Sequence, residues 1–599
     1  MIFGRSQRVV TGSRDQERSV KVALRFQTFR GKVIGRGLHF LVNYSFRNSR
    51  VNLRTQIPAY LTTAFAFLAG KGRRKCVEPR ERWGKEVARD RDMDRIGLYH
   101  RTLECAQAKV DERTWQDLGM DDLFAKLDRT VGMPGAQLLY HQLRTYEEND
   151  LVLTERARQQ GVFKKDTALR EKILPLLARL NKSGAVWIAP LLLNPIPELP
   201  RYAWLLYLSS GLSLGCLIGT VLFPPLLIGV LLLFLVNMLV NATYGTKITP
   251  YFYGFSQIDP LLGVGSALGR ITEGAALPQL NYLKENAALI AGLKNKFGWV
   301  AIDRTAQNEL VQSLYEYLNN LFLFDVLIFL RSLKNLREHR EVLSRIWGEV
   351  ASLDASLSVA SYAAGVGGVT VPTLVDARRL EVAGLYHPLL SSPVGNELSL
   401  NDRSALVSGS NMAGKTTFIR TVGINLILAR TLAICHAQRA VFPRAMVRSA
   451  IRREDQLSDG QSYFFAELKQ IQEFIVAAES GPLHLFLLDE IFRGTNTIER
   501  ISASTAVLRN LSRRQMVLVT THDIELQELL KESFDMGHFS ERFEEGECRF
   551  DYRLQPGPAH SRNAIKLLGI SGYPQAITQE AELIAAQLSA QFERRSGLG

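Results

Sequence analysis

Residue types that can grip and cleave a phosphate chain are concentrated in the C-terminal third of this 599-residue sequence. The segment Gly409–Thr416 reads Gly-Ser-Asn-Met-Ala-Gly-Lys-Thr and fits the pattern G-x-x-x-x-G-K-[ST]. It follows the apolar run Ala405–Val407 and precedes Thr417–Ala429, which we expect to be helical; a phosphate-binding loop requires this setting. Glycines let backbone N–H groups turn toward the phosphates, and the helix N-terminus adds positive charge. We therefore expect ATP to contact Gly409, Ser410, Asn411, Met412, Ala413, Gly414, Lys415, Thr416 and Thr417.

The reactive groups are expected from this loop and from the end of a second strand. Lys415 would reach the β- and γ-phosphates, and the Thr416 hydroxyl would bind Mg²⁺. The apolar run Leu485–Leu488 ends in Asp489 and Glu490. A buried strand would bring Asp489 to the loop as a second Mg²⁺ ligand, and Glu490 would polarise the water that attacks the γ-phosphate.

A third strand end contributes a histidine. The run Met516–Val519 is followed by two threonines and His522. A lone histidine is more often structural, but after such a strand, in this order, we interpret His522 as a γ-phosphate sensor that helps to orient the water. The predicted catalytic residues are thus Lys415, Glu490 and His522, and the predicted metal ligands are Thr416 and Asp489.

The elements that position these motifs fall into two kinds of domain. After residue 375, short β-rich runs alternate with helices, which is typical of an α/β domain with a largely parallel sheet. Before it, apolar residues recur at helical spacing from Asp111 to about Leu180 and over Glu309–Ala363. We expect a basic arm (1–105), an all-α core or lever domain (106–200 and 247–375) interrupted by a hairpin (201–246), an ATPase domain (376–545) and a C-terminal tail (546–599).

The interrupting segment, Tyr202–Thr246, is a run of 45 residues without a charge. A bilayer core about 30 Å thick needs about 20 helical residues. A Pro-Pro pair divides the run, and we predict two transmembrane helices, Trp204–Phe223 and Leu226–Ala242. A buried helical hairpin of a large soluble core is the alternative. Arg201 and Lys247 flank the run, which favours a cell-membrane location with both ends and the ATPase domain on the cytoplasmic side.

The net charge of +14 is confined to the N-terminal arm, because residues 1–100 hold 22 basic and 8 acidic side chains. The arm could bind nucleic acid or anionic lipid through screened electrostatics, or it could be a loosely ordered tail, or its start codon could be set too far upstream. The five cysteines are scattered. They form no metal or redox motif, which fits a reducing cytosol.

Together the motifs resemble those of the MutS family of DNA mismatch-repair ATPases, which are relatives of the ABC ATPases. The resemblance rests on the phosphate loop, on Asp455–Ser462 (Asp-Gln-Leu-Ser-Asp-Gly-Gln-Ser), on Asp489-Glu490 with Arg493-Gly494-Thr495, and on Thr521-His522. Five segments outside the ATPase motifs add to it: Leu123–Thr130 with Gly135–Leu139, Leu353–Ala360, Tyr386–Pro388, Phe550–Leu554 and Ala564–Pro574.

The resemblance implies an ABC-type P-loop fold that hydrolyses ATP to ADP and phosphate with Mg²⁺. It also implies a homodimer formed through the ATPase domains, in which Gly460 and Ser462 reach the nucleotide of the second subunit and the C-terminal tail stabilises the pair. DNA is the partner that the family suggests.

The family's DNA-reading apparatus is only partly represented in this sequence. Residues 1–110 contain no Phe-x-Glu wedge, and only Leu280–Val300 could stand for a much reduced clamp. We therefore expect a membrane-anchored, MutS-like ATPase without a mismatch reader. An ABC-type transporter, which Leu457–Gln461 echoes, is disfavoured by the single hairpin. A non-hydrolysing membrane scaffold that does not bind DNA is disfavoured by Glu490 and His522.

Overall fold

The structure of the protein is a computed structural model. It describes residues 83–86, 91–103, 108–196, 198, 202–272, 277–297, 309–410, 413–451, 463–544, 547–558 and 573–596. All of them belong to one compact unit, residues 78–599. Most of the predicted basic arm lies outside the described residues. The end of that segment forms α3 and α4, whose contacts with helix α7 join it to the helical core rather than to a loose arm.

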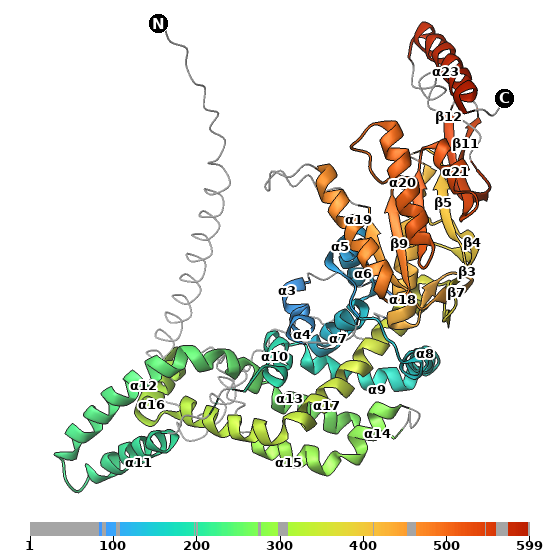
Figure 1. Cartoon of the computed structure of the whole chain (residues 1–599). Helices are drawn as coiled ribbons and strands as arrows, with labels where there is room; N and C mark the ends of the chain where they lie inside the picture. Colours follow the sequence, from blue (N-terminus) through green and yellow to red (C-terminus); the bar gives the residue numbers. More distant parts are fainter. Residues whose placement is uncertain are drawn as a thin grey trace, which may run out of the picture. The chain divides into compact units, whose positions relative to one another are not determined.

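Helices account for all regular structure in the described residues before residue 369 (Figure 1). They are α3 (Met93–Ile96), α4 (Leu98–Thr102), α5 (Glu112–Asp117), α6 (Met120–Leu127), α7 (Met133–Arg144), α8 (Asp150–Lys165), α9 (Thr167–Leu177), η2 (Ala178–Leu180), η3 (Ser183–Trp187), α10 (Ile188–Leu193), α11 (Ala203–Gly219), α12 (Leu226–Phe255), α13 (Ile258–Leu268), α14 (Pro278–Glu285), α15 (Ala287–Phe297), α16 (Glu309–Phe322) and α17 (Phe324–Val366).

The 43-residue helix α17 organises this region. Its buried Asp354 accepts hydrogen bonds from the backbone N–H groups of Val131 (3.0 Å) and Gly132 (2.7 Å), which precede α7. A carboxylate at the start of a helix satisfies free N–H groups and complements the helix dipole. Gly135 lets the two helices approach, since a Cβ there would lie 2.3 Å from the Asp354 carboxylate.

The segment predicted as a reduced clamp forms α14 and α15, which fold back on α13 and α17. Their inward residues, among them Leu283, Ile290 and Leu293, are buried in the same hydrophobic cluster as α17. This segment therefore packs as part of the helical core as far as Phe297.

The uncharged run forms a hairpin of α11 and α12, but not the two spans that we predicted. Among the described residues, one helical stretch, Leu226–Tyr244, is long and apolar enough to cross a membrane. α11 has only 17 residues, because the chain leaves the helix at Gly219 in a tight turn ahead of Pro224. α12 continues past Ala242 because its last residue, Phe255, is fully buried in the helical core. The helix lengths therefore do not support a two-span hairpin.

The C-terminal domain is an α/β domain, and the prediction of a largely parallel sheet is confirmed. In the described part of the chain, its main sheet has the strand order β12-β11-β5-β10-β9-β8. The strands β5 (Ser404–Ser408), β8 (Met446–Ala450), β9 (His484–Asp489), β10 (Met516–Thr521) and β11 (Phe534–Glu544) are parallel, and β12 (Glu547–Pro556) is antiparallel to β11. The sheet thus continues past residue 545, where we placed the end of the ATPase domain.

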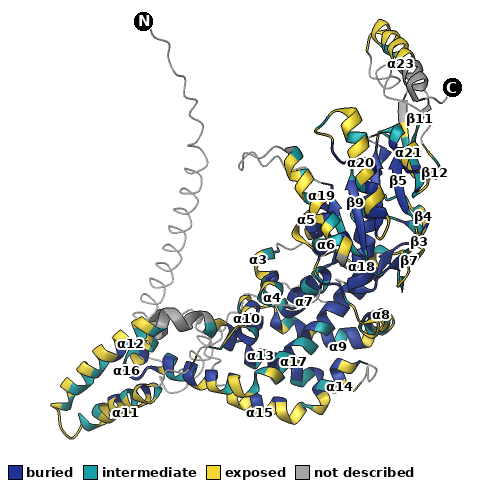
Figure 2. Cartoon of the chain, viewed as in Figure 1, coloured by how far each residue is buried: buried dark blue, intermediate teal, exposed yellow. Residues whose placement is uncertain are grey.

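Burial explains why the central strands form. β5 is buried at every position (Figure 2), and so is β10, as expected of parallel strands covered on both faces. The flanking helices are α18 (Lys415–Leu432), α19 (Tyr463–Ser480), α20 (Thr497–Ser512) and α21 (Ile524–Leu530), and α23 (Gln575–Ser596) follows the sheet. A smaller sheet joins β2 (Thr373–Val375), β7 (Arg439–Pro443), β3 (Arg379–Leu385) and β4 (Asn396–Asn401), and β1 (Val369–Thr370) pairs with β6 (Cys435–His436).

A buried polar network joins the end of α17 to α18, the helix that follows the phosphate loop. The Tyr362 hydroxyl lies 2.7 Å from Nε2 of His436. Burial lowers the pKa of His436 to about 3. The ring is therefore neutral, and its Nε2 accepts a hydrogen bond from the Tyr362 hydroxyl. Asn425 of α18 accepts the backbone N–H of His436 (2.7 Å). His436 of β6 therefore links α18 to α17 through hydrogen bonds.

Gly135→Ala should lower the stability of the chain, because the added methyl group would overlap the Asp354 carboxylate. Overpacking of this kind costs about 1–3 kcal/mol. The midpoint of thermal unfolding of the purified protein measures it. Gly161→Ala in α8 is the matched control, since nothing lies within 4 Å of its Cβ position; this variant should be neutral or slightly more stable. Equal midpoints for the two variants would contradict the close approach.

Candidate nucleotide-hydrolysis site

The phosphate loop connects β5 to α18 with a backbone that its glycines make possible. Gly409 and Gly414 have φ angles of 133° and 100°, in the region that residues with a side chain avoid. A Cβ on Gly409 would also lie 2.7 Å from the Phe539 carbonyl oxygen on the neighbouring strand β11. α18 begins at Lys415 directly after Gly414, so its free N–H groups face the loop.

Lys415 is held over this loop by main-chain oxygens. Its Nζ donates to the carbonyls of Gly409 (2.5 Å) and Ser410 (3.0 Å). The side chain is 2% exposed, and burial lowers the pKa of Lys415 to about 8. The ammonium group is therefore desolvated and can interact strongly with a phosphate.

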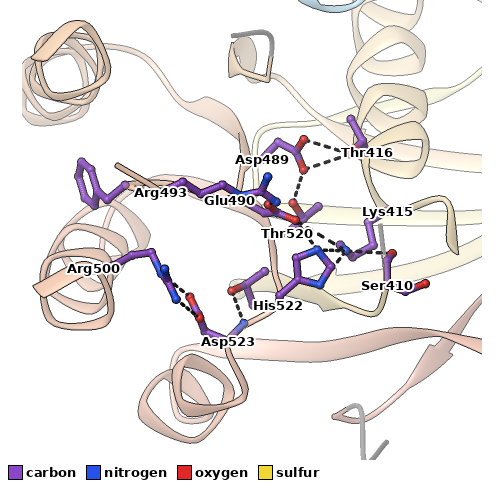
Figure 3. A network of polar contacts seen from close by, with 12 residues as sticks. Ser410, Lys415, Thr416, Asp489, Glu490, Arg493, Arg500, Thr520, His522 and Asp523 are labelled. Carbon is purple, nitrogen blue, oxygen red and sulfur yellow. Dashed lines mark hydrogen bonds and ion pairs between the residues drawn. The ribbon is translucent and has the colours of Figure 1, made fainter. Parts of the chain in front are cut away.

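Two oxygen-bearing side chains meet beside the loop and fit a magnesium ion. The Thr416 hydroxyl donates to Asp489 at 3.0–3.1 Å, and the Thr520 hydroxyl donates to the same carboxylate (Figure 3). Mg²⁺ prefers such hard oxygen donors and is completed by water and substrate phosphates. No group of three His, Cys, Asp or Glu side chains that could hold a metal occurs among the residues with described positions. Thr416 and Asp489 are thus suited to share Mg²⁺ with a nucleotide.

Glu490 has an unusual backbone conformation, which β10 and α19 help to fix. Its φ is 55°, and that of Phe492 is 61°. The Glu490 N–H donates to the Thr520 carbonyl (3.1 Å), and the Phe492 N–H donates to the Glu467 carboxylate (2.7 Å). Positive φ at two residues with large side chains is unfavourable, and such conformations cluster at functional sites.

The Glu490 carboxylate is surrounded by cations and by His522. Nε2 of His522 lies 2.7 Å from it, Nζ of Lys415 lies at 3.8 Å, and Arg493 also pairs with it (Figure 3). Burial and then the charges of Lys415 and Arg493 lower the pKa of His522 to about 4. The ring is therefore neutral at pH 7. Its Nε2 lies 2.7 Å from the Glu490 carboxylate and 3.1 Å from Nζ of Lys415, and its Nδ1 lies 3.4 Å from the same Nζ.

A second ion pair secures the strand end that carries His522. Arg500 of α20 forms a two-point bond to Asp523, with distances of 2.6 and 3.1 Å. The Asp523 N–H donates to the Thr521 hydroxyl (3.0 Å). A cavity of about 310 Å³ opens here, and Glu490, His522 and Asp523 are among its lining residues.

The structure thus brings five predicted residues to one edge of the sheet: Lys415, Thr416, Asp489, Glu490 and His522. Gly409, Ser410, Ala413, Gly414 and Thr417 lie in the loop and at the start of α18, as expected. Asn411, Met412, Gly460 and Ser462 lie outside the described residues, so their predicted contacts stay predictions. The catalytic and metal-binding roles also stay predictions.

Four polar residues of the site were not predicted: Thr520, Glu467, Arg500 and Asp523. Thr520 and Asp523 flank the Thr521-His522 pair, so their place at the strand end gave a signal. The sequence gave no signal for Arg500 and Glu467. Each contacts a partner on a different element, 23 and 25 residues away in the chain, respectively.

Comparisons with known proteins identify a family model and several relatives that this chain resembles. Residues 405–589 match the family model described as MutS domain V. The DNA mismatch repair protein MutS of Thermus thermophilus is 30% identical over 275 residues, which are 45% of this chain and 33% of that protein. That of Thermus caldophilus is 26% identical over 518 residues, 80% of this chain and 61% of the relative. MutS protein homolog 4 of Mus musculus is 28% identical over 339 residues, 54% of this chain and 34% of the relative. The chain spans between one third and three fifths of the length of these relatives.

Glu490→Gln should slow ATP hydrolysis about 10²- to 10⁴-fold, which is the usual contribution of a general base. The affinity for ATP should change little, because the phosphates are held by Lys415 and the loop. Single-turnover hydrolysis and equilibrium nucleotide binding measure the two quantities. Glu528→Gln, on an exposed ion pair of α21, is the control and should leave both unchanged. Unaltered turnover in Glu490→Gln would exclude Glu490 as the base.

ATP affinity should fall as the pH rises, because the buried Lys415 has its pKa lowered to about 8. The protonated, phosphate-binding form is complete below that pKa and is lost above it, so binding should be about tenfold weaker at pH 9 than at pH 7. Calorimetric titration at several pH values measures this. Lys415→Arg, whose charge does not titrate in this range, should show a flat pH profile. A wild-type affinity that is constant from pH 7 to pH 9 would contradict the effect.

Proposed function

This chain belongs to the MutS family, and from that premise we propose that it is a membrane-anchored, dimeric ATPase that hydrolyses ATP to ADP and phosphate with Mg²⁺ and acts on DNA. The observation that carries the ATPase part is the convergence of Lys415, Glu490 and His522 at the end of three strands (Figure 3).

The chemistry follows from the positions of these groups. Loop N–H groups and the Lys415 ammonium hold the β- and γ-phosphates. Bound Mg²⁺ would neutralise charge on the phosphate oxygens, and Thr416 and Asp489 are the residues that would hold it. Glu490 takes the proton of the attacking water, the water oxygen bonds to the γ-phosphorus, and the bond to the ADP oxygen breaks. The neutral His522 ring, whose Nε2 lies 2.7 Å from the Glu490 carboxylate, helps to hold this carboxylate in place.

Dimerisation through the ATPase domains is supported by exposed apolar residues next to the site. Phe465 and Leu468 of α19 are 57% and 40% exposed, and Ile498 at the start of α20 is 76% exposed. Exposed apolar clusters of this kind mark interaction surfaces. In the sequence, the segment Asp455–Ser462 directly precedes α19.

Membrane anchoring is supported by the inverted polarity of the α11–α12 hairpin. Large apolar side chains lie exposed along both helices, whereas Ser213 and Asn237 are completely buried between them. Water favours apolar side chains inside and polar ones outside. Lipid favours apolar side chains on the outside and hydrogen-bonded polar ones between the helices, as seen here. The base of the hairpin carries Trp204 and the tyrosines Tyr202 and Tyr244, whose hydroxyls are hydrogen-bonded to each other. In membrane proteins, aromatic residues are enriched at the interface between membrane and water. We place the hairpin in the cell membrane and the ATPase domain in the cytoplasm.

Action on DNA rests on the relatives, whose names describe DNA mismatch repair proteins. The charge of the sequence offers one route, since the excess of basic residues lies within residues 1–100. The test is the ATPase rate of the full chain with duplex, mismatched and branched DNA across a salt series. Stimulation that falls steeply with salt indicates phosphate contacts. Indifference to every DNA would refute this part of the proposal and leave the ATPase.

Mixing two inactive variants should restore ATPase activity if the site is shared between protomers. Lys415→Ala and Ser462→Ala should each be inactive alone. In a mixed dimer, the intact Lys415 of one protomer would face the intact Ser462 of the other. Random mixing should then restore about a quarter of wild-type activity, if the two sites act independently. The ATPase rate of a one-to-one mixture measures this, and two preparations of the same variant are the control. No recovery would exclude a contribution of Ser462 across the dimer.

A further inference from the structure

A break in the chain joins helix α16 to α17, at the side of the hairpin. α16 ends at Phe322, α17 starts at Phe324, and the two helices bend by 68°. Leu323 between them has the left-handed backbone conformation, with φ 54°. Asp325 fixes this bend by accepting from the Tyr315 hydroxyl (2.6 Å) and the Asn319 amide (2.9 Å).

The hairpin supplies the hydrogen bonds that the end of α16 lacks. The last carbonyl groups of a helix have no partner within it. The Asn237 amide donates to the Leu321 carbonyl (2.7 Å), and the Ser210 hydroxyl donates to the Phe322 carbonyl (2.8 Å). In a bilayer, broken helices occur only where neighbouring side chains satisfy the freed backbone groups in this way.

The end of α16 contacts the hairpin at Ser210 and Asn237, some distance from the base of the hairpin. The hydrogen-bonded hydroxyls of Tyr202 and Tyr244 mark the base. Ser210 lies eight residues after Tyr202, and Asn237 lies seven residues before Tyr244. At 1.5 Å per residue, the end of α16 is about 11 Å along the hairpin. If the hairpin is inserted to its base, the end of α16 lies within the hydrocarbon layer.

Leu314, Tyr317 and Leu318 make the exposed side of α16 mostly apolar, although Ser313 and Glu316 are exposed as well. Leu314 is 60% exposed and Tyr317 is 67% exposed, whereas Asn319 is buried. Residues 309–324 contain two charged side chains, Glu309 and Glu316. Taken as a bent pair, α16 and the start of α17 are together long and apolar enough to span a membrane. Alone, α16 has 14 residues, which is too short to cross a layer about 30 Å thick.

We propose that α16 is a third membrane element, which inserts partway into the bilayer beside the α11–α12 hairpin and is held there by Asn237 and Ser210. The proposal rests on the membrane anchoring described above. The occupant of its apolar face is lipid, because Leu314, Tyr317 and Leu318 of α16 are exposed like the large apolar side chains of α11 and α12, and because Ser210 and Asn237 of the hairpin bond to the end of α16.

Spin-label accessibility in vesicles of phosphatidylethanolamine and phosphatidylglycerol tests the proposal on the full-length protein. Cys76, Cys105, Cys216 and Cys548 are replaced by serine, while the fully buried Cys435 is kept because it does not react with the label. Nitroxides are then attached singly to L318C on α16, to L232C in the hairpin and to E528C on the ATPase domain. Collisions with oxygen report lipid, and collisions with a nickel chelate report water.

Oxygen-dominated collisions at L318C and L232C, with nickel-dominated collisions at E528C, are the expected result. Nickel dominance at L318C with oxygen dominance at L232C would overturn the insertion of α16 but leave the anchoring intact. Nickel dominance at all three sites would refute the anchoring itself. A label at L318C that neither reagent reaches would show that protein covers this face, and would also overturn the proposal.

The docking contact is tested by Asn237→Leu in the L318C protein. Without the amide, the label should move from oxygen-dominated to nickel-dominated collisions, while the label at L232C stays in lipid. Thr243→Val is the matched control, because this hydroxyl bonds only carbonyls of its own helix. Ser210→Ala provides a milder second variant, with a smaller shift in the same direction. An unchanged L318C signal in both docking variants would exclude these side chains as the anchor of α16.

Discussion

The parallel pairing of β5, β10 and β9 is the constraint on which the candidate nucleotide-hydrolysis site depends. The register aligns Ser408 with Thr521, and Thr520 with Asp489. Because parallel strands end at the same edge, segments that are far apart in the sequence deliver their next residues to one place. The phosphate loop, Glu490 and His522 therefore meet there, although the loop and the histidine are separated by more than 100 positions.

The same geometry connects the site to the helical core. α18 starts at the phosphate loop and carries Asn425, which holds the strand residue His436 against Tyr362 of α17. At the other end of α17, the bend at Leu323 leads to α16 and the hairpin. A single 43-residue helix thus extends from the ATPase domain to the segment that we place in the membrane. A movement of the nucleotide site has a continuous route along it.

Strand-end reasoning predicted the residues of the site from the sequence because each lies directly after a buried apolar run. It could not predict what depends on three-dimensional contact. The pairing of Arg500 with Asp523, and the support of Phe492 by Glu467, join separate elements. The positive φ of Glu490 also has no sequence signal, since the residue is not glycine.

The hairpin shows a different limit. The uncharged run predicted two helices, and they form, but composition alone could not say where they end. α11 ends at Gly219, five residues before the proline pair, whereas α12 continues to Phe255, which is buried in the helical core. The sheet also continues past residue 545, where we predicted the end of the ATPase domain, because β12 pairs with β11.

A structure of the protein with Mg²⁺ and a non-hydrolysable ATP analogue tests the central claim most directly. The account predicts that Lys415 leaves the loop carbonyls and contacts the β- and γ-phosphates. It also predicts that Thr416 and Asp489 share the metal, and that Glu490 holds a water in line with the γ-phosphate. A γ-phosphate bound away from Lys415, or a Glu490 carboxylate turned away from it, would contradict the account.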